Sequence, residues 1–205
     1  RRDFERGFRP VPGRPLTFTA PGLVRGLRTE QMEFIPFFRL HDARYTVYFP
    51  YSTPAGYARM QEQTAAREKD RLALDARTID QVAPGEQQPE SDHGFAGEGV
   101  AAGVNHGRHW RHASGWFSYR LNDPRGAGRV LRLTYAAADA GRQFDIYVNG
   151  ALLARETLAP NPEEFYERDL ALPAGVAQAG RVEVKFVARA GSIAGGLYGV
   201  RLLGE

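Results

Sequence analysis

The side chains best suited to contact a ligand gather in one stretch, the run from Gly107 to Tyr119. It contains Trp110, Trp116, Phe117 and Tyr119, and histidine and arginine side chains lie among and beside them. A sugar ring offers C–H faces that stack on aromatic rings and hydroxyls that need paired donors and acceptors, so such a mixture is typical of a shallow sugar-binding surface.

Strand alternation divides these aromatic residues. On a strand beginning at Gly115, Trp116 shares one face with Ser118 and Arg120, whereas Phe117 and Tyr119 share the other face and are expected in the core. Trp110 precedes this strand and is expected in an exposed loop. The candidate carbohydrate-binding residues are therefore Trp110, His109, Arg111, His106 and His93.

Carboxylates gather just upstream, where Glu86, Glu90 and Asp92 precede His93 in a stretch with Gly and Pro. Oxygen-rich loops can hold calcium, which takes six to eight oxygen ligands, so these three carboxylates are candidates for a structural calcium ion. A solvated loop, or one whose carboxylates pair with Arg108 and Arg111, is the alternative. Zinc is disfavoured because the histidines lack a short fixed spacing on a predicted helix.

Several kinds of catalytic chemistry find no support in the chain. It contains no cysteine, which excludes thiolate nucleophiles, disulfides and cysteine-ligated metal. No Gly-x-Ser-x-Gly motif occurs, and Gly191 to Gly196 lacks the lysine of a phosphate loop, so we interpret it as a bend leading into the last strand. His41, Asp42 and Arg44 are expected in a buried turn rather than a catalytic dyad. No catalytic residue and no cofactor other than calcium are predicted.

Charge and hydropathy limit the partners. The chain has 205 residues with 27 Lys and Arg against 24 Asp and Glu, a net charge of +3, and the basic residues are scattered. Nucleic-acid binding is therefore not expected, since it needs a continuous basic stripe. No apolar stretch is long enough to span a bilayer, so no membrane partner is expected. The start at Arg1 without Met suggests a piece of a longer polypeptide.

The first part of the chain combines strand-like runs with one helix. Aromatic and branched residues predict strands over 16–20, 31–40 and 44–49, too few for an independent sandwich. Residues 1–53 are therefore expected to be terminal strands of an upstream β-sandwich. Thr53 as N-cap and Pro54 at the first helical position predict a connecting helix over 54–77.

Residues 78–205 predict a C-terminal β-sandwich. A short strand over 78–82 and a long loop over 84–108 come first. Further strands recur at regular spacing, over 115–121, 129–136, 143–148, 152–158, 164–170, 182–188 and 197–203. Asn149-Gly150 between two of them is a strong hairpin signal. The predicted fold class is mainly β: an antiparallel sandwich or jelly roll, galactose-binding-like in strand spacing, preceded by a partial β-domain and one connecting α-helix.

Three segments carry a resemblance to a known family. They are Pro36 to Tyr48, Asp80 to His93 and Gly191 to Gly196, and with the tryptophan-rich run they extend over nearly the whole chain. They resemble the C-terminal β-domains of bacterial glycoside hydrolases related to the family 127 and family 146 β-L-arabinofuranosidases. The resemblance implies that the catalytic α/α barrel and its zinc-bound cysteine belong to another part of the parent polypeptide. It further implies that the parent's catalytic domain is a partner and that the compartment is periplasmic or extracellular.

The sequence thus predicts a non-catalytic accessory module of a carbohydrate-active enzyme, which contacts plant or bacterial glycan through Trp110. A purely structural interdomain or oligomerisation module without ligand is the alternative. The feature that favours this alternative is the aromatic N-terminal segment, which is expected to need another domain or subunit to bury its apolar side chains.

Overall fold

The computed structural model describes residues 7–20, 33–39, 52–175 and 180–205. The chain divides into two compact units, Arg1–Arg59 and Met60–Glu205. No helix among the described residues is both long and apolar enough to cross a membrane.

The first unit contains a small antiparallel sheet in the order β1-β2-β3. Its described elements are β1 (Arg9–Pro10), β2 (Phe18–Thr19), β3 (Glu33–Phe34) and the 3-10 helix η1 (Phe37–Arg39). The strand predicted over 31–40 is therefore wrong beyond β3. Pro36 cannot donate to a sheet ladder, and its carbonyl instead accepts the amide of Arg39 at 2.9 Å, which closes the 3-10 turn. The predicted strand over 44–49 and the predicted turn at His41, Asp42 and Arg44 lie outside the described residues.

Helix α2 (Pro54–Arg77) has the predicted bounds. Thr53 caps it, because its Oγ1 accepts the amide of Gly56 at 3.1 Å. None of its residues is buried, and Arg71 forms ion pairs with Glu68 at 2.7 Å and Asp75 at 2.8 Å along its surface. A helix that is polar all round and supported by such pairs is stable without a buried face.

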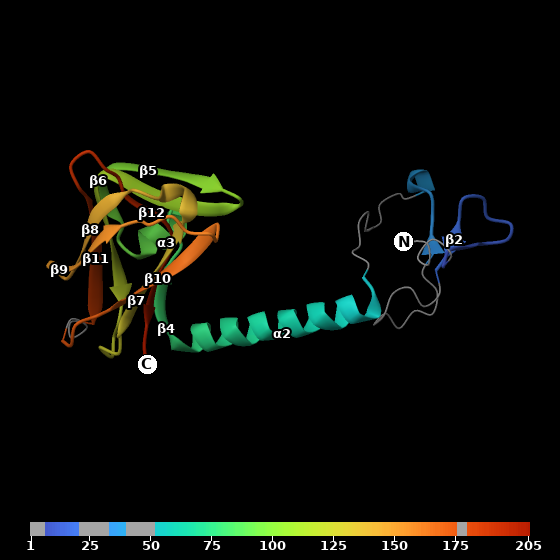
Figure 1. Ribbon diagram of the computed structural model, residues 1–205, viewed down its shortest axis with the longest axis horizontal. Helices are drawn as coiled ribbons and strands as arrows, with labels where there is room; N and C mark the ends of the chain where they lie inside the picture. The colour runs from blue at the N-terminus through green and yellow to red at the C-terminus, as the bar shows by residue number, and fades with distance from the viewer. Residues whose placement is uncertain (1–6, 21–32, 40–51, 176–179) are drawn as a thin grey trace. The chain divides into compact units, whose positions relative to one another are not determined.

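The remaining elements build the sandwich (Figure 1). They are β4 (Thr78–Val82), α3 (Gln87–Asp92), β5 (Ala96–Asn105), β6 (Arg108–Asn122), β7 (Val130–Ala136), η2 (Ala137–Asp139), β8 (Gln143–Val148), β9 (Ala151–Thr157), β10 (Phe165–Ala171), β11 (Arg181–Ala188) and β12 (Ala194–Leu203). The mainly β prediction is confirmed. The hairpin at Asn149-Gly150 is also confirmed, since both residues have positive φ, 47° and 80°.

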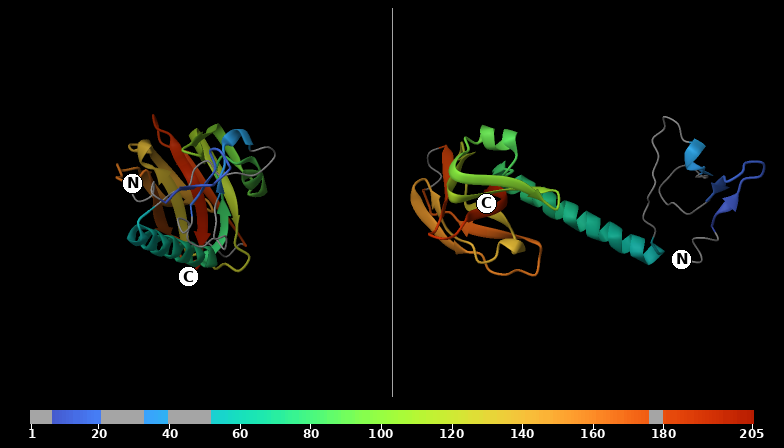
Figure 2. Two further views of the ribbon diagram at one scale, coloured as in Figure 1. Left: turned by 90° about the vertical axis from the view of Figure 1, so that its right-hand side faces the viewer. Right: turned by 90° about the horizontal axis from the view of Figure 1, so that it is seen from above.

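All pairings in the sandwich are antiparallel. The order is β10-β7-β12-β6-β11-β8-β9, with β4 added to β12 and β5 added to β6. The single sheet folds into two layers, because inward-facing rings of strands that do not pair, such as Tyr135 on β7 and Phe144 on β8, meet at 6.1 Å between centroids. The β5–β6 hairpin, drawn in green, projects beyond the layers (Figures 1 and 2).

The core lies between these layers. Phe117, Tyr119 and Leu121 are fully buried on β6, as strand alternation predicted, and the Phe117 ring stacks on Phe186 of β11 at 4.9 Å. Trp116, Ser118 and Arg120 alternate with them and therefore point to the outer face.

The long loop predicted over 84–108 is wrong, since this segment contains α3 and all of β5. Strand β5 was not predicted because its sequence is rich in glycine. A Cβ at Gly103 would lie 2.6 Å from the indole of Trp110, and one at Gly97 would lie 2.8 Å from the carbonyl of Trp116. The glycines are thus required by the bulky neighbouring strand β6, although glycine in a strand normally indicates a loop.

Candidate functional site

Strand β6 presents Arg108, Trp110 and His112 on one face. These are alternate residues of one strand, so their side chains project in the same direction about 7 Å apart. Arg108 is exposed, and Trp110 and His112 are partly exposed. Trp110 therefore lies on a strand rather than in the predicted loop, and part of its surface is open to solvent.

The indole of Trp110 has a fixed position. It packs against the imidazole of His112, with 4.7 Å between ring centroids and 32° between the ring planes. It also lies over Gly103 on β5, which faces Trp110 in the strand register. A ring held on two sides loses little conformational entropy when a ligand stacks on it.

Charged side chains from the β7–β8 connection border His112. Arg142 Nη1 lies 3.5 Å from His112 Nδ1 and donates to the carbonyl of Gly195 at 3.3 Å, and its Nη2 forms an ion pair with Asp139 at 2.6 Å. Gly196 makes room for this pair, because a Cβ there would lie 2.1 Å from Asp139 Oδ2.

The surroundings of His112 and Asp139 determine the protonation state of each side chain. Burial, with the neighbouring cations Arg142 and Arg111, lowers the pKa of His112 below its ordinary value, which favours the neutral imidazole. Burial raises the pKa of Asp139, against the opposing attraction of Arg142. The site thus combines a neutral imidazole with one ion pair, a set able both to donate and to accept hydrogen bonds.

Two further aromatic residues complete this face. The rings of Phe165 on β10 and Tyr198 on β12 meet edge to face at 4.8 Å, and the guanidinium of Arg108 lies 4.5 Å above the Phe165 ring. Asn105 in the β5–β6 hairpin donates to the Tyr198 hydroxyl at 3.3 Å. We name the whole set the Trp110 surface; it consists of Arg108, Trp110, His112, Asp139, Arg142, Phe165 and Tyr198.

Trp110 alone of this set was among the predicted sugar ligands. Arg108 and His112, two positions before and after it on β6, were not singled out as ligands. Four more distant members were missed as well: Asp139, Arg142, Phe165 and Tyr198. They are separated from Trp110 by 29 to 88 positions in the chain. One signal was available for Phe165 and Tyr198: each sits beside an inward-facing residue of its strand and so belongs to the outer face.

Arg111, a predicted sugar ligand, instead has a structural role. It forms an ion pair with the buried carboxylate of Glu90, which also accepts the Tyr119 hydroxyl at 2.8 Å and the Gly85 amide at 2.8 Å. Burial raises the pKa of Glu90, but hydrogen bonds from Arg111, Gly85 and Tyr119 outweigh it and hold the value below the ordinary one. The alternative that carboxylates of this segment pair with Arg111 therefore holds for Glu90.

His93 is buried as well. Its Nδ1 lies 2.6 Å from the carbonyl of Pro89, and its Nε2 lies 3.2 Å from Asp80 Oδ1. The other Asp80 oxygen accepts the Asn122 amide at 2.6 Å. These bonds tie β4, α3 and β6 together, and they leave the His93 ring on a different part of the sandwich from Trp110.

The other two predicted histidines lie in or beside the β5–β6 turn. His106 is exposed, adopts a positive φ of 48° and pairs with Glu164. His109 is exposed on β6, but strand alternation places it on the opposite face from Trp110. Among the described residues, neither histidine forms a ring contact or a hydrogen bond with Trp110 or His112, so their role in sugar binding remains a prediction.

The predicted calcium ligands are not gathered into a site. Glu90 is occupied by Arg111 and Tyr119, Asp92 accepts from Gln88 at 2.7 Å, and Glu86 is exposed. Within the described parts of the chain, no group of three or more His, Asp or Glu side chains is arranged to hold a metal ion. The calcium site remains a prediction that no described contact supports.

Solved structures with similar strand arrangements have low sequence identity to this chain. A family 35 carbohydrate binding module from Clostridium thermocellum is 16% identical over 54% of this chain and 92% of its own, with a TM-score of 0.43. A CBM35 from Paenibacillus barcinonensis is 14% identical over 55% and 94%, with a TM-score of 0.39. The ANX1 ectodomain from Arabidopsis thaliana is 10% identical over 60% and 40%, with a TM-score of 0.44.

Comparison with curated proteins gives no match. Two family models do match. A domain of unknown function, DUF4986, matches residues 1–51, and a family of unknown function, DUF6805, matches residues 73–203. The second match covers more than half of the chain and includes the whole sandwich from β4 to β12. The chain therefore belongs to the DUF6805 family.

Proposed function

We propose that this protein is a non-catalytic accessory module of a carbohydrate-active enzyme and that it binds glycan through the Trp110 surface. One observation carries the proposal. A partly exposed indole, fixed by His112 and Gly103, lies beside an ion pair that is itself still partly exposed, with 22% of the Arg142 side chain open to solvent.

Each part of this surface matches a part of a sugar. The open portion of Trp110 offers an apolar face for the C–H groups of a pyranose or furanose ring. Arg142 can donate to ring hydroxyls, while Asp139 and the neutral imidazole can accept from them. Tyr198 and Phe165 extend the aromatic surface along the neighbouring strands. Such a surface binds without reacting, since none of these groups is a positioned nucleophile with its base.

We also propose the finer assignment, that the parent is a glycoside hydrolase related to families 127 and 146. The resemblance of the segment from Asp80 to His93 supports it, and the structure gives that segment a fold-maintaining role through Glu90 and His93. On this proposal, residues 1–53 are terminal strands of an upstream sandwich, 54–77 a connecting helix and 78–205 the glycan-contacting sandwich.

Calorimetric titration with arabinose-, galactose- and rhamnose-containing oligosaccharides tests the binding role. We expect at least one to bind, and Trp110→Ala to weaken that binding by about fivefold or more, since stacking on an aromatic ring contributes about 1 kcal/mol or more. Leu72→Ala, at an exposed position on α2 outside the Trp110 surface, is the control and should bind normally. Absence of binding to the whole panel would leave only a structural role.

A structural interdomain or oligomerisation module is the second candidate. The exposed apolar side chains of the first unit favour it, since Phe37 is 68% exposed, Phe38 66% and Leu16 66%. Expressing the parent with and without residues 1–205 separates the two functions. Loss of a structural module lowers solubility and melting temperature, whereas loss of a binding module lowers affinity for polymeric substrate.

A further inference from the structure

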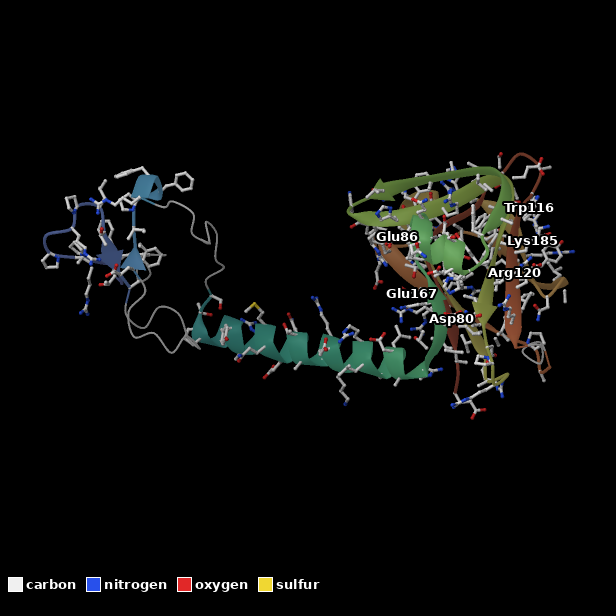
Figure 3. All side chains as sticks on the ribbon, turned by 180° about the vertical axis from the view of Figure 1, so that it is seen from behind. Asp80, Glu86, Trp116, Arg120, Glu167 and Lys185 are labelled. Atoms are coloured by element: carbon white, nitrogen blue, oxygen red, sulfur yellow. The ribbon has the colours of Figure 1, made fainter. Side chains whose placement is uncertain are left out.

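A second arrangement of aromatic and charged residues lies further along β6, where that strand pairs with β11 rather than with β12. Trp116 on β6, Lys185 on β11 and Tyr147 on β8 project outward from three adjacent strands. The register pairs Lys185 with Ser118 on one side and with Tyr147 on the other. Trp116 and Lys185 lie beside each other on this face (Figure 3).

Lys185 is held in place by the indole. Its Nζ lies 4.0 Å from the centroid of the Trp116 ring, within the range of a cation–π contact. Both side chains are partly exposed, and beneath them Phe117 and Phe186 are fully buried. The ammonium group is therefore fixed over a rigid support, so a ligand that binds it pays little further entropy for ordering the lysine side chain.

Most charges around Lys185 are already neutralised. Arg120 pairs with Glu183 at 4.0 Å, and Arg189 pairs with Asp145 at 2.7 Å. Glu98 is the register partner of Trp116 on the far side of β6 from Lys185. Within the described residues, Lys185 has no carboxylate at ion-pair distance, so its ammonium group is available to pair with an anionic ligand.

Tyr147 adds a ring next to this charge. It is partly exposed and lies on the adjacent strand, about 5 Å from the backbone of Lys185. Leu152, which pairs with Tyr147 on β9, is 44% exposed and continues the apolar row. A charged donor followed by an aromatic ring and an aliphatic side chain matches a saccharide that carries an anionic group on one sugar and apolar C–H faces on the next.

We propose that the Trp116–Lys185–Tyr147 face is a second glycan-binding site, selective for carboxylated saccharides. Lys185 binds the carboxylate, Tyr147 stacks on the adjoining sugar ring, and Trp116 positions the ammonium group. Charge complementarity decides between ligands: a neutral saccharide would leave the lysine without the ion pair that the site offers. The site is separate from the Trp110 surface and does not depend on it.

Titration of the full chain with an oligogalacturonate and with a neutral galactan oligosaccharide of equal length tests this proposal. We expect the oligogalacturonate to bind at least tenfold more tightly and its affinity to fall as salt concentration rises. Lys185→Gln and Tyr147→Ala should each weaken its binding by about tenfold or more. Trp116→Phe should retain most of the binding because a ring still supports the ammonium, whereas Trp116→Ala should not.

The chain offers a matched control, since its second lysine, Lys69, is exposed on α2. Lys69→Gln removes the same charge and should leave binding unchanged, as should Trp110→Ala. Equal affinity for both saccharides, no binding of the oligogalacturonate, or an unaltered affinity in Lys185→Gln would each overturn the proposal. Binding of neutral sugars that depends on Trp110 alone would keep the proposed function while rejecting this second site.

Discussion

The guanidinium of Arg111 donates two hydrogen bonds to the carboxylate of Glu90, from Nε at 2.9 Å and from Nη2. This pair joins α3 to β6 and is buried, since only 4% of the Glu90 surface is exposed. Two residues that sequence reasoning assigned to metal binding and to sugar binding are thus partners in one buried network.

Glu90→Gln is expected to lower the free energy of unfolding by about 3 kcal/mol, because removing one charge of a buried pair leaves the other uncompensated. Chemical denaturation measures this loss. Glu86→Gln, at an exposed position just before the same helix, is the control and should change stability little. A Glu90→Gln variant as stable as the parent chain would show that the pair does not hold α3 in place.

The same pair predicts acid sensitivity. The folded-state pKa of Glu90 lies below its ordinary value of 4.5, so the contribution of the ionised carboxylate to the free energy of unfolding is fully present above pH 4.5. It is lost as pH falls through the folded-state pKa. The dependence of stability on pH below 4.5 should therefore be weaker in Glu90→Gln than in the unaltered chain, as measured by denaturation at several pH values.

Two buried tyrosines should respond to the same substitution in opposite ways. Tyr119 donates to Glu90, whereas the Tyr135 hydroxyl has no hydrogen-bond partner among the described residues. Tyr119→Phe should therefore cost about 2 kcal/mol, and Tyr135→Phe should be neutral or stabilise the protein by about 1 kcal/mol. Thermal and chemical denaturation of the two variants check this, and a large loss in Tyr135→Phe would contradict it.

Trp110 should report the protonation of His112. A protonated imidazole quenches indole fluorescence, and the two rings are 4.7 Å apart. Because the pKa of His112 is lowered, quenching should begin only at a pH below its ordinary value of 6.5. The neutral imidazole is the form the fold prefers, so its contribution to stability is present above 6.5 and is lost as pH falls through the folded-state pKa.

The measurement is a pH titration of fluorescence in a Trp116→Phe background, which leaves Trp110 as the single indole. His112→Gln should abolish the transition. A midpoint at or above 6.5 would mean that burial and the neighbouring arginines do not control this imidazole.

Gly196→Ala should disrupt the Asp139–Arg142 pair. The added Cβ would lie 2.1 Å from Asp139 Oδ2, in a residue whose φ is +85°. We expect a loss of at least about 2 kcal/mol from backbone strain and displacement of the carboxylate. Gly191→Ala is the control. Its φ is +76°, but nothing lies within 4 Å of its Cβ position, so this variant has the backbone strain without a steric clash. Denaturation of both variants and the Trp110 fluorescence of each measure the difference.

The fold class, most strands of the sandwich, α2 and the division of β6 into a core face and an outer face could all be predicted from the amino-acid sequence. These features depend on neighbours in the chain: alternation, an N-cap at Thr53 and turn residues such as Asn149-Gly150. A local pattern is enough to predict them, because alternating burial, helix capping and turn conformation each leave their signal in residues that are close together in the chain.

The contacts between side chains from different elements became visible only in the folded chain. Strand β5 was missed because its glycines are set by Trp110 and Trp116 of the neighbouring strand, which no local pattern reveals. Arg111 and His93 were assigned to a ligand although folding pairs them with Glu90 and Asp80. Asp139, Phe165 and Tyr198 reach Trp110 and its neighbours only through strand pairing between distant segments, because register and layer packing join residues that the chain keeps apart.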